Sequence, residues 1–210
     1  MTFDRQFELF IMKYNALEST KTEIRHVYEF MIETYQGGGK LLACGNGGSA
    51  ADSEHIVGEL MKGFQKPRAL TQGDKARFLA VPHGARLAQC LQTPLPAISL
   101  VSQTGLITAV ANDTDPALVF AQQVFGYGRA GDLLLALSTS GNSENVVCAA
   151  AAAKALGLRA AAITGRQDSQ LSALCDHTIR LPADTPADVQ ELTLPVYHFL
   201  CAATEEYFFG

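Results

Sequence analysis

The most constraining feature of the sequence is a short apolar run, Leu41 to Cys44, that leads through a glycine-rich turn into a helix. A run of four apolar residues has the length of a buried strand. The turn reads GNGG over residues 45–48, and its glycines allow a tight turn and a close approach of the backbone to a ligand. Ser49 is a candidate N-cap, and Asp52 places a negative charge in the first turn, where the helix dipole favours it. We therefore expect a helix from about Ala50 to Lys62.

A strand, a glycine turn and a helix start together form a cradle for an anion, because free backbone N–H groups and the helix dipole point at one spot. Further along the same helix, His55 and Glu59 are four residues apart and share one face. An imidazole and a carboxylate at this spacing can hold one divalent metal ion, or act as a proton donor and a base. Such a pair on its own is more often a surface pair of an amphipathic helix. The glycine turn ahead of it favours a functional pair.

The composition indicates an ordinary globular protein. The chain has 210 residues, of which 48% are hydrophobic and 18% charged, and this suits one α/β domain with a helical extension. Its formal net charge of −5 argues against nucleic-acid-binding proteins, which usually carry a basic face. The five cysteines include no CxxC pair, and we interpret them as reduced core thiols of a cytoplasmic protein. We expect neither a signal peptide nor a membrane helix, since no basic, apolar leader and no long uncharged run are found.

The segments on either side of the central stretch differ in character. Apolar residues at helical spacing predict two helices within residues 3–36, and three glycines end the second one. Residues 1–38 are therefore expected to form a helical extension that covers the sheet or builds an oligomer interface. Residues 63–94 contain three prolines and several basic residues, and we expect an insertion or a lid over the site.

From residue 97 onward, apolar runs alternate with helical stretches, which indicates a parallel sheet with helices on both faces. The expected strands are residues 97–101, 132–137, 159–163 and 178–181, and the last helix is expected to run from about Ala187 to Phe208.

A second polar loop, STSGNS at residues 138–143, follows the expected strand 132–137 and precedes an alanine-rich helix at about 144–156. Its hydroxyls and backbone N–H groups can bind phosphate oxygens without a lysine. A simple N-cap and turn has the same composition, since Ser, Thr and Asn dominate both. Two such loops at the carboxyl edge of one parallel sheet are stronger evidence, because that edge is where these sheets bind ligands.

Five motifs, in this order, resemble the phosphoheptose isomerase family of sugar-isomerase (SIS) domains. They are CGNGGSAAD, ANDTD, STSGNS, AITG and VQE with a later histidine, and the match covers about Gly39 to Tyr207. The resemblance implies one SIS domain over residues 1–210, with a flavodoxin-like, three-layer α/β fold and a five-stranded parallel sheet. It also implies an isomerase that converts sedoheptulose 7-phosphate to D-glycero-D-manno-heptose 7-phosphate through an enediol, as a cytoplasmic homotetramer with sites near the subunit interfaces.

The resemblance implies the site residues as well. Glu59 would be the base and His198 the acid. The metal set, for one zinc ion per site, would be His55, Glu59, Gln190 and His198. The substrate-binding residues would come from the two loops, from an Asn–Asp pair and from the glutamine of the last helix: Asn46, Gly47, Gly48, Ser49, Asn112, Asp113, Ser138, Thr139, Ser140, Ser143 and Gln190.

Two alternative functions stay open. One is a non-catalytic SIS module that senses a sugar phosphate or binds a protein partner, and the other is an isomerase for another phosphosugar. A related, partner-binding branch of the family lacks the counterparts of Glu59 and His198. This sequence keeps both residues, which favours the enzyme.

The sequence departs from the family pattern at several points: the stretch between Glu59 and Leu95 is longer, Pro195 falls between Gln190 and His198, and Ala187 stands where the family has an acidic residue. It lacks the arginine that follows the family's glutamate, and Lys62 and Arg68 are the candidates to replace it. Gln190 and His198 are eight residues apart, which is about 12 Å along a straight helix. One metal ion reaches both only if Pro195 bends this helix or if neighbouring chains share the site.

Overall fold

Five parallel strands form the central sheet of the computed structural model, which describes residues 2–210. The strands are β1 (Leu41–Cys44), β2 (Ala97–Ser99), β3 (Leu133–Leu137), β4 (Arg159–Thr164) and β5 (His177–Arg180). Their order is β2-β1-β3-β4-β5, and every neighbouring pair is parallel. The connection from β1 leads to β2 on one side, and the connection from β2 leads to β3 on the other side of β1. The topological switch point of the sheet therefore lies between β1 and β3. In sheets of this order, ligands bind beyond the carboxyl ends of these two strands.

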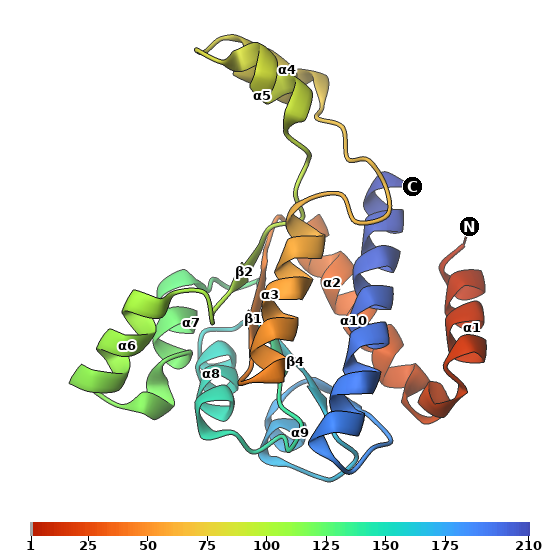
Figure 1. Cartoon of the computed structure of the whole chain (residues 1–210), viewed down its shortest axis with the longest axis vertical. Helices are drawn as coiled ribbons and strands as arrows, with labels where there is room; N and C mark the ends of the chain where they lie inside the picture. Colours follow the sequence, from red (N-terminus) through yellow and green to blue (C-terminus); the bar gives the residue numbers. More distant parts are fainter. Residues whose placement is uncertain (1) are drawn as a thin grey trace.

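Alternate residues of each strand face opposite sides of the sheet, and each side has its own hydrophobic core. Leu133 and Leu135 belong to one core, while Leu134 and Ala136 belong to the other. The first side is covered by α1 (Phe3–Lys13), α2 (Lys21–Gln36), α3 (Gly48–Met61) and α10 (Pro186–Phe209), and the second by α6 (Thr104–Asp113), α7 (Ala121–Tyr127), α8 (Glu144–Ala155) and α9 (Gln170–Leu174). Two short 3-10 helices, η1 (Asn15–Thr20) and η2 (Pro116–Leu118), complete these layers (Figure 1).

The expected three-layer, flavodoxin-like architecture with N-terminal helices is confirmed, with small shifts at the element ends. The expectation that Ser49 caps α3 is wrong. The cap is Gly47, whose φ of 56° lies in the region that glycine adopts most easily, and the helix begins at Gly48. Ser49 is consequently a buried residue of the first turn, and Asp52 lies one turn later than expected.

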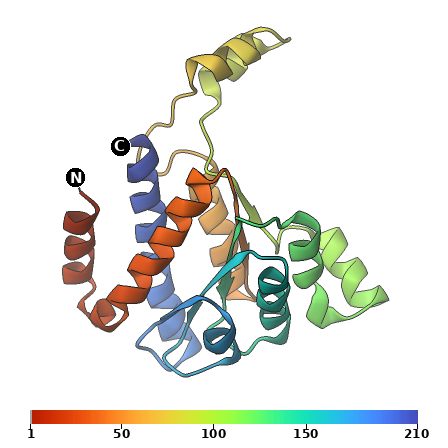
Figure 2. The same cartoon turned by 180° about the vertical axis from the view of Figure 1, so that it is seen from behind.

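The segment 63–94 is a helical hairpin of α4 (Gln72–Leu79) and α5 (Gly84–Cys90). It leaves α3 at Met61, the end of the helix opposite the glycine turn. Figures 1 and 2 show the hairpin projecting away from the body of the molecule, beyond the end of the sheet that is opposite the two polar loops. Within one chain, therefore, the hairpin does not form the lid over the site that the sequence led us to expect.

A buried ion pair anchors the start of this segment. Arg68 is 1% exposed and donates from Nε to Oε1 of Glu205 over 2.7 Å. The Glu205 carboxylate also accepts hydrogen bonds from the backbone N–H groups of residues 64–66. The remaining Arg68 nitrogens donate to the carbonyls of Glu59 and Leu60 at the end of α3. Arg68 is thus committed to the fold, so it does not replace the family's arginine as a substrate ligand.

The structure also bears on the expectations that the cysteines are core thiols and that no helix crosses a membrane. Cys44 and Cys201 are buried core thiols as expected, but Cys90 is exposed, because it ends the projecting hairpin, and Cys148 and Cys175 are half-buried. Over residues 2–210, no helix combines the length and the apolar character needed to cross a membrane.

Candidate active site

The two polar loops lie side by side because they follow neighbouring strands. Residues 45–47 follow β1, and residues 138–143 follow β3. A reciprocal pair of amide hydrogen bonds joins them: Asn46 Nδ2 donates to Asn145 Oδ1 over 2.8 Å, and Asn145 Nδ2 donates to Asn46 Oδ1 over 2.9 Å. This pair fixes the two helix N-termini, of α3 and α8, relative to each other. Asn145 was missed by the sequence analysis, because nothing local in its helix indicates a partner a hundred residues away.

The second loop is held open by its own hydroxyls. Ser138 Oγ accepts a hydrogen bond from the Gly141 N–H over 3.1 Å and lies 3.1 Å from Ser143 Oγ. Ser140 Oγ accepts from the Asn142 N–H over 3.2 Å. The φ of 67° at Gly141 makes this tight return possible. The arrangement is that of an anion cradle, with hydroxyl groups and the first amides of α8 around one point.

A cavity of about 290 Å³ borders this loop. Thr139 and Ser140 contribute to its wall, together with Arg166 of the loop after β4. Thr139 is half-buried and Ser140 is exposed. The second loop therefore offers polar groups to a ligand in this cavity as well.

The imidazole and carboxylate predicted on α3 lie beside the histidine predicted on α10. His55 Nε2 is 3.1 Å from Glu59 Oε1, and the rings of His55 and His198 are 4.9 Å apart and nearly perpendicular. Tyr197, buried in the core next to His198, places its hydroxyl 2.9 Å from His55 Nδ1 and 3.3 Å from Asp52 Oδ1. The structure thus joins three predicted site residues and adds two that the sequence analysis did not assign to the site.

The hydrogen bonds around Tyr197 decide which nitrogen of His55 carries the proton. Burial, and after it the charge of Asp52, raises the pKa of the Tyr197 phenol, so the phenol keeps its proton and donates a hydrogen bond to Asp52. Its oxygen then accepts from the His55 Nδ1–H. His55 Nε2 consequently faces the Glu59 carboxylate over 3.1 Å, a contact that is favourable with a proton or a metal cation between the two atoms.

Within residues 2–210, two further atoms of this cluster are buried without a hydrogen-bond partner: Glu59 Oε2 and His198 Nε2. The nearest cation to Glu59 Oε2 is the ammonium of Lys62, 3.5 Å away. Burial, and after it the neighbouring His55, lowers the pKa of His198, so its imidazole stays neutral near pH 7. Unpartnered imidazole nitrogen and carboxylate oxygen are the donors that zinc takes in proteins. His55, Glu59 and His198 therefore fit a zinc ion by their chemistry.

Gln190 lies elsewhere. Its side-chain amide packs against Gly48, where an added Cβ would come within 2.6 Å of Gln190 Nε2. It therefore contacts the glycine turn at the start of α3, while His198 lies beside His55 further along that helix. The Asn112 and Asp113 side chains are exposed at the end of α6, and they hydrogen-bond to each other over 2.8 Å. Within one chain, the predicted set divides into a phosphate end, an imidazole–carboxylate cluster and this separate pair.

A cavity of about 490 Å³ opens beside His198. It lies between α1, α10 and the first residues after α3, with Phe10, Phe64 and Phe199 in its wall. His198 thus has access to solvent and to a ligand, although its Nε2 is buried.

Comparisons with known proteins agree with this geometry. Models of the SIS domain match residues 11–76 and 102–203. The phosphoheptose isomerase of Aromatoleum aromaticum is 40% identical over 201 residues, covering 94% of this chain and 89% of that protein. The chain belongs to the phosphoheptose isomerase family. Solved structures of phosphoheptose isomerases are similar throughout: that of Neisseria gonorrhoeae (TM-score 0.73, 29% identity, 97% and 98% of the two chains) and that of Francisella tularensis (TM-score 0.74, 29% identity, 98% and 100%).

Membership of the phosphoheptose isomerase family confirms two expectations from the sequence, the family and the SIS fold. It also confirms that the chain is an enzyme, an isomerase of the phosphosugar class, rather than a non-catalytic SIS module.

Proposed function

We propose that this isomerase interconverts sedoheptulose 7-phosphate and D-glycero-D-manno-heptose 7-phosphate through an enediol. An aldose–ketose isomerisation needs a base at one carbon, a proton donor near the neighbouring oxygen, and a site for the phosphate. The two loops beyond β1 and β3 supply the phosphate site, with Ser49, Ser138, Thr139, Ser140 and Ser143 as hydroxyl ligands.

Glu59 is the proposed base. Its two carboxylate oxygens have different surroundings: Oε1 lies 3.1 Å from His55, while Oε2 is buried and accepts no hydrogen bond. This buried oxygen is the observation that carries the proposal: its nearest cation is Lys62, 3.5 Å away, and a carboxylate oxygen buried without a hydrogen bond costs free energy unless it serves the reaction. Oε2 takes the proton from the substrate carbon, and the neutral imidazole of His198 donates a hydrogen bond to the substrate oxygen.

His55, Glu59 and His198 are the residues that would hold the proposed zinc ion, one per site, and a bound zinc ion would polarise the substrate carbonyl. The sequence placed Gln190 in the same metal set. Its contact with Gly48 supports a role at the sugar or phosphate end of the substrate instead.

We also propose a cytoplasmic homotetramer with sites near the subunit interfaces. Exposed apolar side chains on α1 (Leu9 and Met12) and on the projecting hairpin (Leu79 and Val81) support burial against other copies of the chain. The five free cysteines support a reducing compartment. Light scattering of the purified protein at micromolar concentration measures the assembly, and a monomer would contradict it.

The test of the proposed reaction is the conversion of purified substrate. The protein is incubated separately with sedoheptulose 7-phosphate and with two alternative substrates, fructose 6-phosphate and ribulose 5-phosphate. The aldose product of each reaction is identified by NMR. We expect conversion of the heptulose phosphate with a kcat/KM at least ~100-fold above that of the others, the selectivity that lost hydrogen bonds to a substrate hydroxyl can produce. A higher kcat/KM for one of the shorter sugar phosphates would show that the proposed substrate is wrong. If none of the three sugar phosphates is converted, the proposed reaction is refuted.

A further inference from the structure

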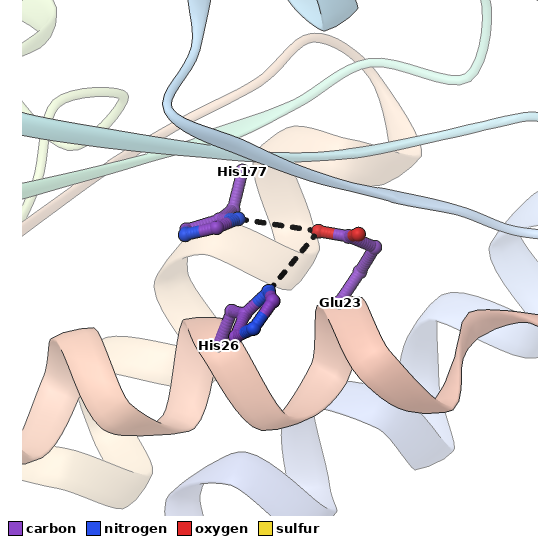
Figure 3. A group of neighbouring side chains, drawn as sticks. All are labelled: Glu23, His26 and His177. Carbon is purple, nitrogen blue, oxygen red and sulfur yellow. Dashed lines mark hydrogen bonds and ion pairs between the residues drawn. The ribbon is translucent and has the colours of Figure 1, made fainter.

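A second group of metal-binding side chains lies away from the candidate active site, between α2 and the edge strand β5. Glu23 and His26 are three residues apart on α2, and His177 is the first residue of β5. Figure 3 shows the Glu23 carboxylate reaching between the two imidazoles. Glu23 Oε2 is 3.3 Å from His177 Nδ1 and 3.8 Å from His26 Nδ1. The sequence analysis did not find this group, because His177 lies 154 residues after Glu23.

Glu23 and His177 are within hydrogen-bond distance of each other, but His26 is left without such a partner among residues 2–210. His26 Nδ1 is buried and has no hydrogen-bond partner, although it faces the Glu23 carboxylate. The two imidazole rings are 4.4 Å apart, and the edge of Phe30 packs on His177 at 4.8 Å, which fixes the ring. The rings are thus held with nitrogen atoms turned toward one carboxylate oxygen, as they would be around a shared cation.

The spacing of the donor atoms suits a small divalent ion. One ligand atom from each of the three residues lies within 4.8 Å of the others. Zinc bonds of about 2.0–2.1 Å in a tetrahedral site place neighbouring ligands roughly 3.3–3.4 Å apart. The measured contacts of 3.3 and 3.8 Å are close to that separation, so a small side-chain adjustment closes the site.

The remaining coordination position has room for water. A cavity of about 390 Å³ borders the group, with Glu23 and His177 in its wall. Its other polar lining includes Asp168, Asp176 and Arg180, of which Arg180 is paired with Asp168. Three protein ligands and one position open to solvent form a common zinc arrangement.

We propose that Glu23, His26 and His177 bind a divalent transition-metal ion, zinc by their donor set, at a site distinct from the one proposed for catalysis. The ion ties α2, which covers one face of the sheet, to the exposed edge of the sheet at β5. Its role is structural, because the site shares no residue with His55, Glu59 or His198. Zinc that binds only the folded state raises the melting temperature as its concentration rises.

The test is zinc binding by the full chain, stripped with chelator and titrated against a chromophoric competitor. The double variant His26→Gln/His177→Gln removes two donors, and His83→Asn is the matched control, an exposed histidine of the hairpin with a φ of 64° that asparagine tolerates. We expect the double variant to bind one zinc ion fewer per chain than the control, to show a smaller zinc-dependent rise in melting temperature than the control, and to keep isomerase activity within about twofold of wild type.

Two further variants keep the inference separate from the proposed catalytic zinc. His55→Gln should lose active-site zinc but retain the ion at Glu23, His26 and His177, along with the part of the zinc-dependent rise in melting temperature that this ion produces. If the double variant fails to fold by circular dichroism, Glu23→Gln, which keeps the side-chain shape, replaces it and should lose the same ion. Equal zinc binding by the donor-depleted variant and by His83→Asn overturns the proposal, whatever the result at the active site.

Discussion

The hydroxyl of Tyr197 lies 2.9 Å from Nδ1 of His55 and connects that imidazole to Asp52. The chain of hydrogen bonds runs from His55 Nδ1–H to the phenol oxygen, and from the phenol to the carboxylate. It fixes both the orientation of the His55 ring and the nitrogen that is left free. Such supporting partners commonly set the affinity of an imidazole for its metal ion. Tyr197 is therefore a positioning residue for the proposed zinc site.

Tyr197→Phe tests this role. The variant keeps the buried ring but removes the hydroxyl, so His55 loses its orienting partner. We expect zinc affinity to fall by about 10–100-fold, with a lower kcat that excess zinc partly restores. Competitive zinc titration and steady-state kinetics at several zinc concentrations measure both effects. Tyr207→Phe is the control, since this tyrosine lies on the same helix and its hydroxyl accepts a hydrogen bond from Gln36, away from His55. Equal zinc affinity in the two variants would remove Tyr197 from the site.

Gln190→Ala separates the metal cluster from the phosphate end of the site. Because Gln190 contacts Gly48, its loss should disturb the substrate and leave the metal in place. We expect KM to rise by roughly tenfold, for about 1–1.5 kcal/mol of hydrogen bonding, with zinc content unchanged. Elemental analysis beside kinetics decides the matter, and loss of zinc from this variant would return Gln190 to the metal set.

Asn145→Ala tests the bridge between the two loops. The variant breaks the paired amide hydrogen bonds to Asn46, so the two helix N-termini are no longer held at one separation. We expect a higher KM with little change in kcat, since phosphate is bound equally in the ground and transition states. Asn46→Ala and the double variant complete a cycle. Because each single change already breaks the pair, the double variant should be little worse than either single variant, and fully additive effects would show that the pair does not act as a unit.

Much of this architecture could be predicted from the sequence, and the reasons are local. Short apolar runs predicted β1 and β3. The glycine-rich and serine-rich segments that follow them predicted the turns by their residue types. The pair His55 and Glu59 was found because residues four positions apart on one helix share a face. In contrast, Asn145 and Tyr197 act through partners distant in the sequence, and their residue types fit an ordinary helix equally well.

The same limit explains the wrong expectations. We expected Ser49 to be the N-cap of α3, but the N-cap is Gly47. The positive φ of Gly47 lets the helix begin two residues earlier than a cap at Ser49 would allow. Arg68 is an attractive candidate ligand by spacing alone. Only the fold shows that Glu205, 137 residues later, neutralises it in the core. Sequence spacing locates partners within one element and does not locate partners across the fold.

Glu205 should control the acid stability of the protein. Burial alone would raise its pKa, but hydrogen bonds from the Phe64 and Gln65 amides and from Arg68 outweigh burial and hold the pKa of Glu205 below its ordinary value of 4.5. Below about that pH the unfolded state takes up a proton more readily than the folded state. The stability that Glu205 contributes is therefore complete above pH 4.5 and is lost as the pH falls through the lower, folded-state pKa.

Glu205→Gln should remove this dependence and leave Arg68 buried without a counter-charge. We expect the free energy of unfolding at pH 7 to fall by about 3–5 kcal/mol, and its decline below pH 4.5 to become shallower. Urea denaturation at a series of pH values measures both quantities. The exposed Glu191→Gln on the same helix is the control and should match wild type. An unchanged acid profile in Glu205→Gln would show that other carboxylates govern acid unfolding.

The central claim, that Glu59 takes a proton from a sugar phosphate, is tested most directly by isotope exchange. Sedoheptulose 7-phosphate is incubated with protein in deuterated water, and deuterium at the carbon next to the carbonyl is followed by NMR. Glu59→Gln keeps the shape of the side chain and removes the base. We predict deuterium incorporation by wild type, and incorporation slowed by roughly 10²–10⁴-fold in Glu59→Gln while phosphate binding is retained. Exchange at a near-normal rate in Glu59→Gln would contradict the account.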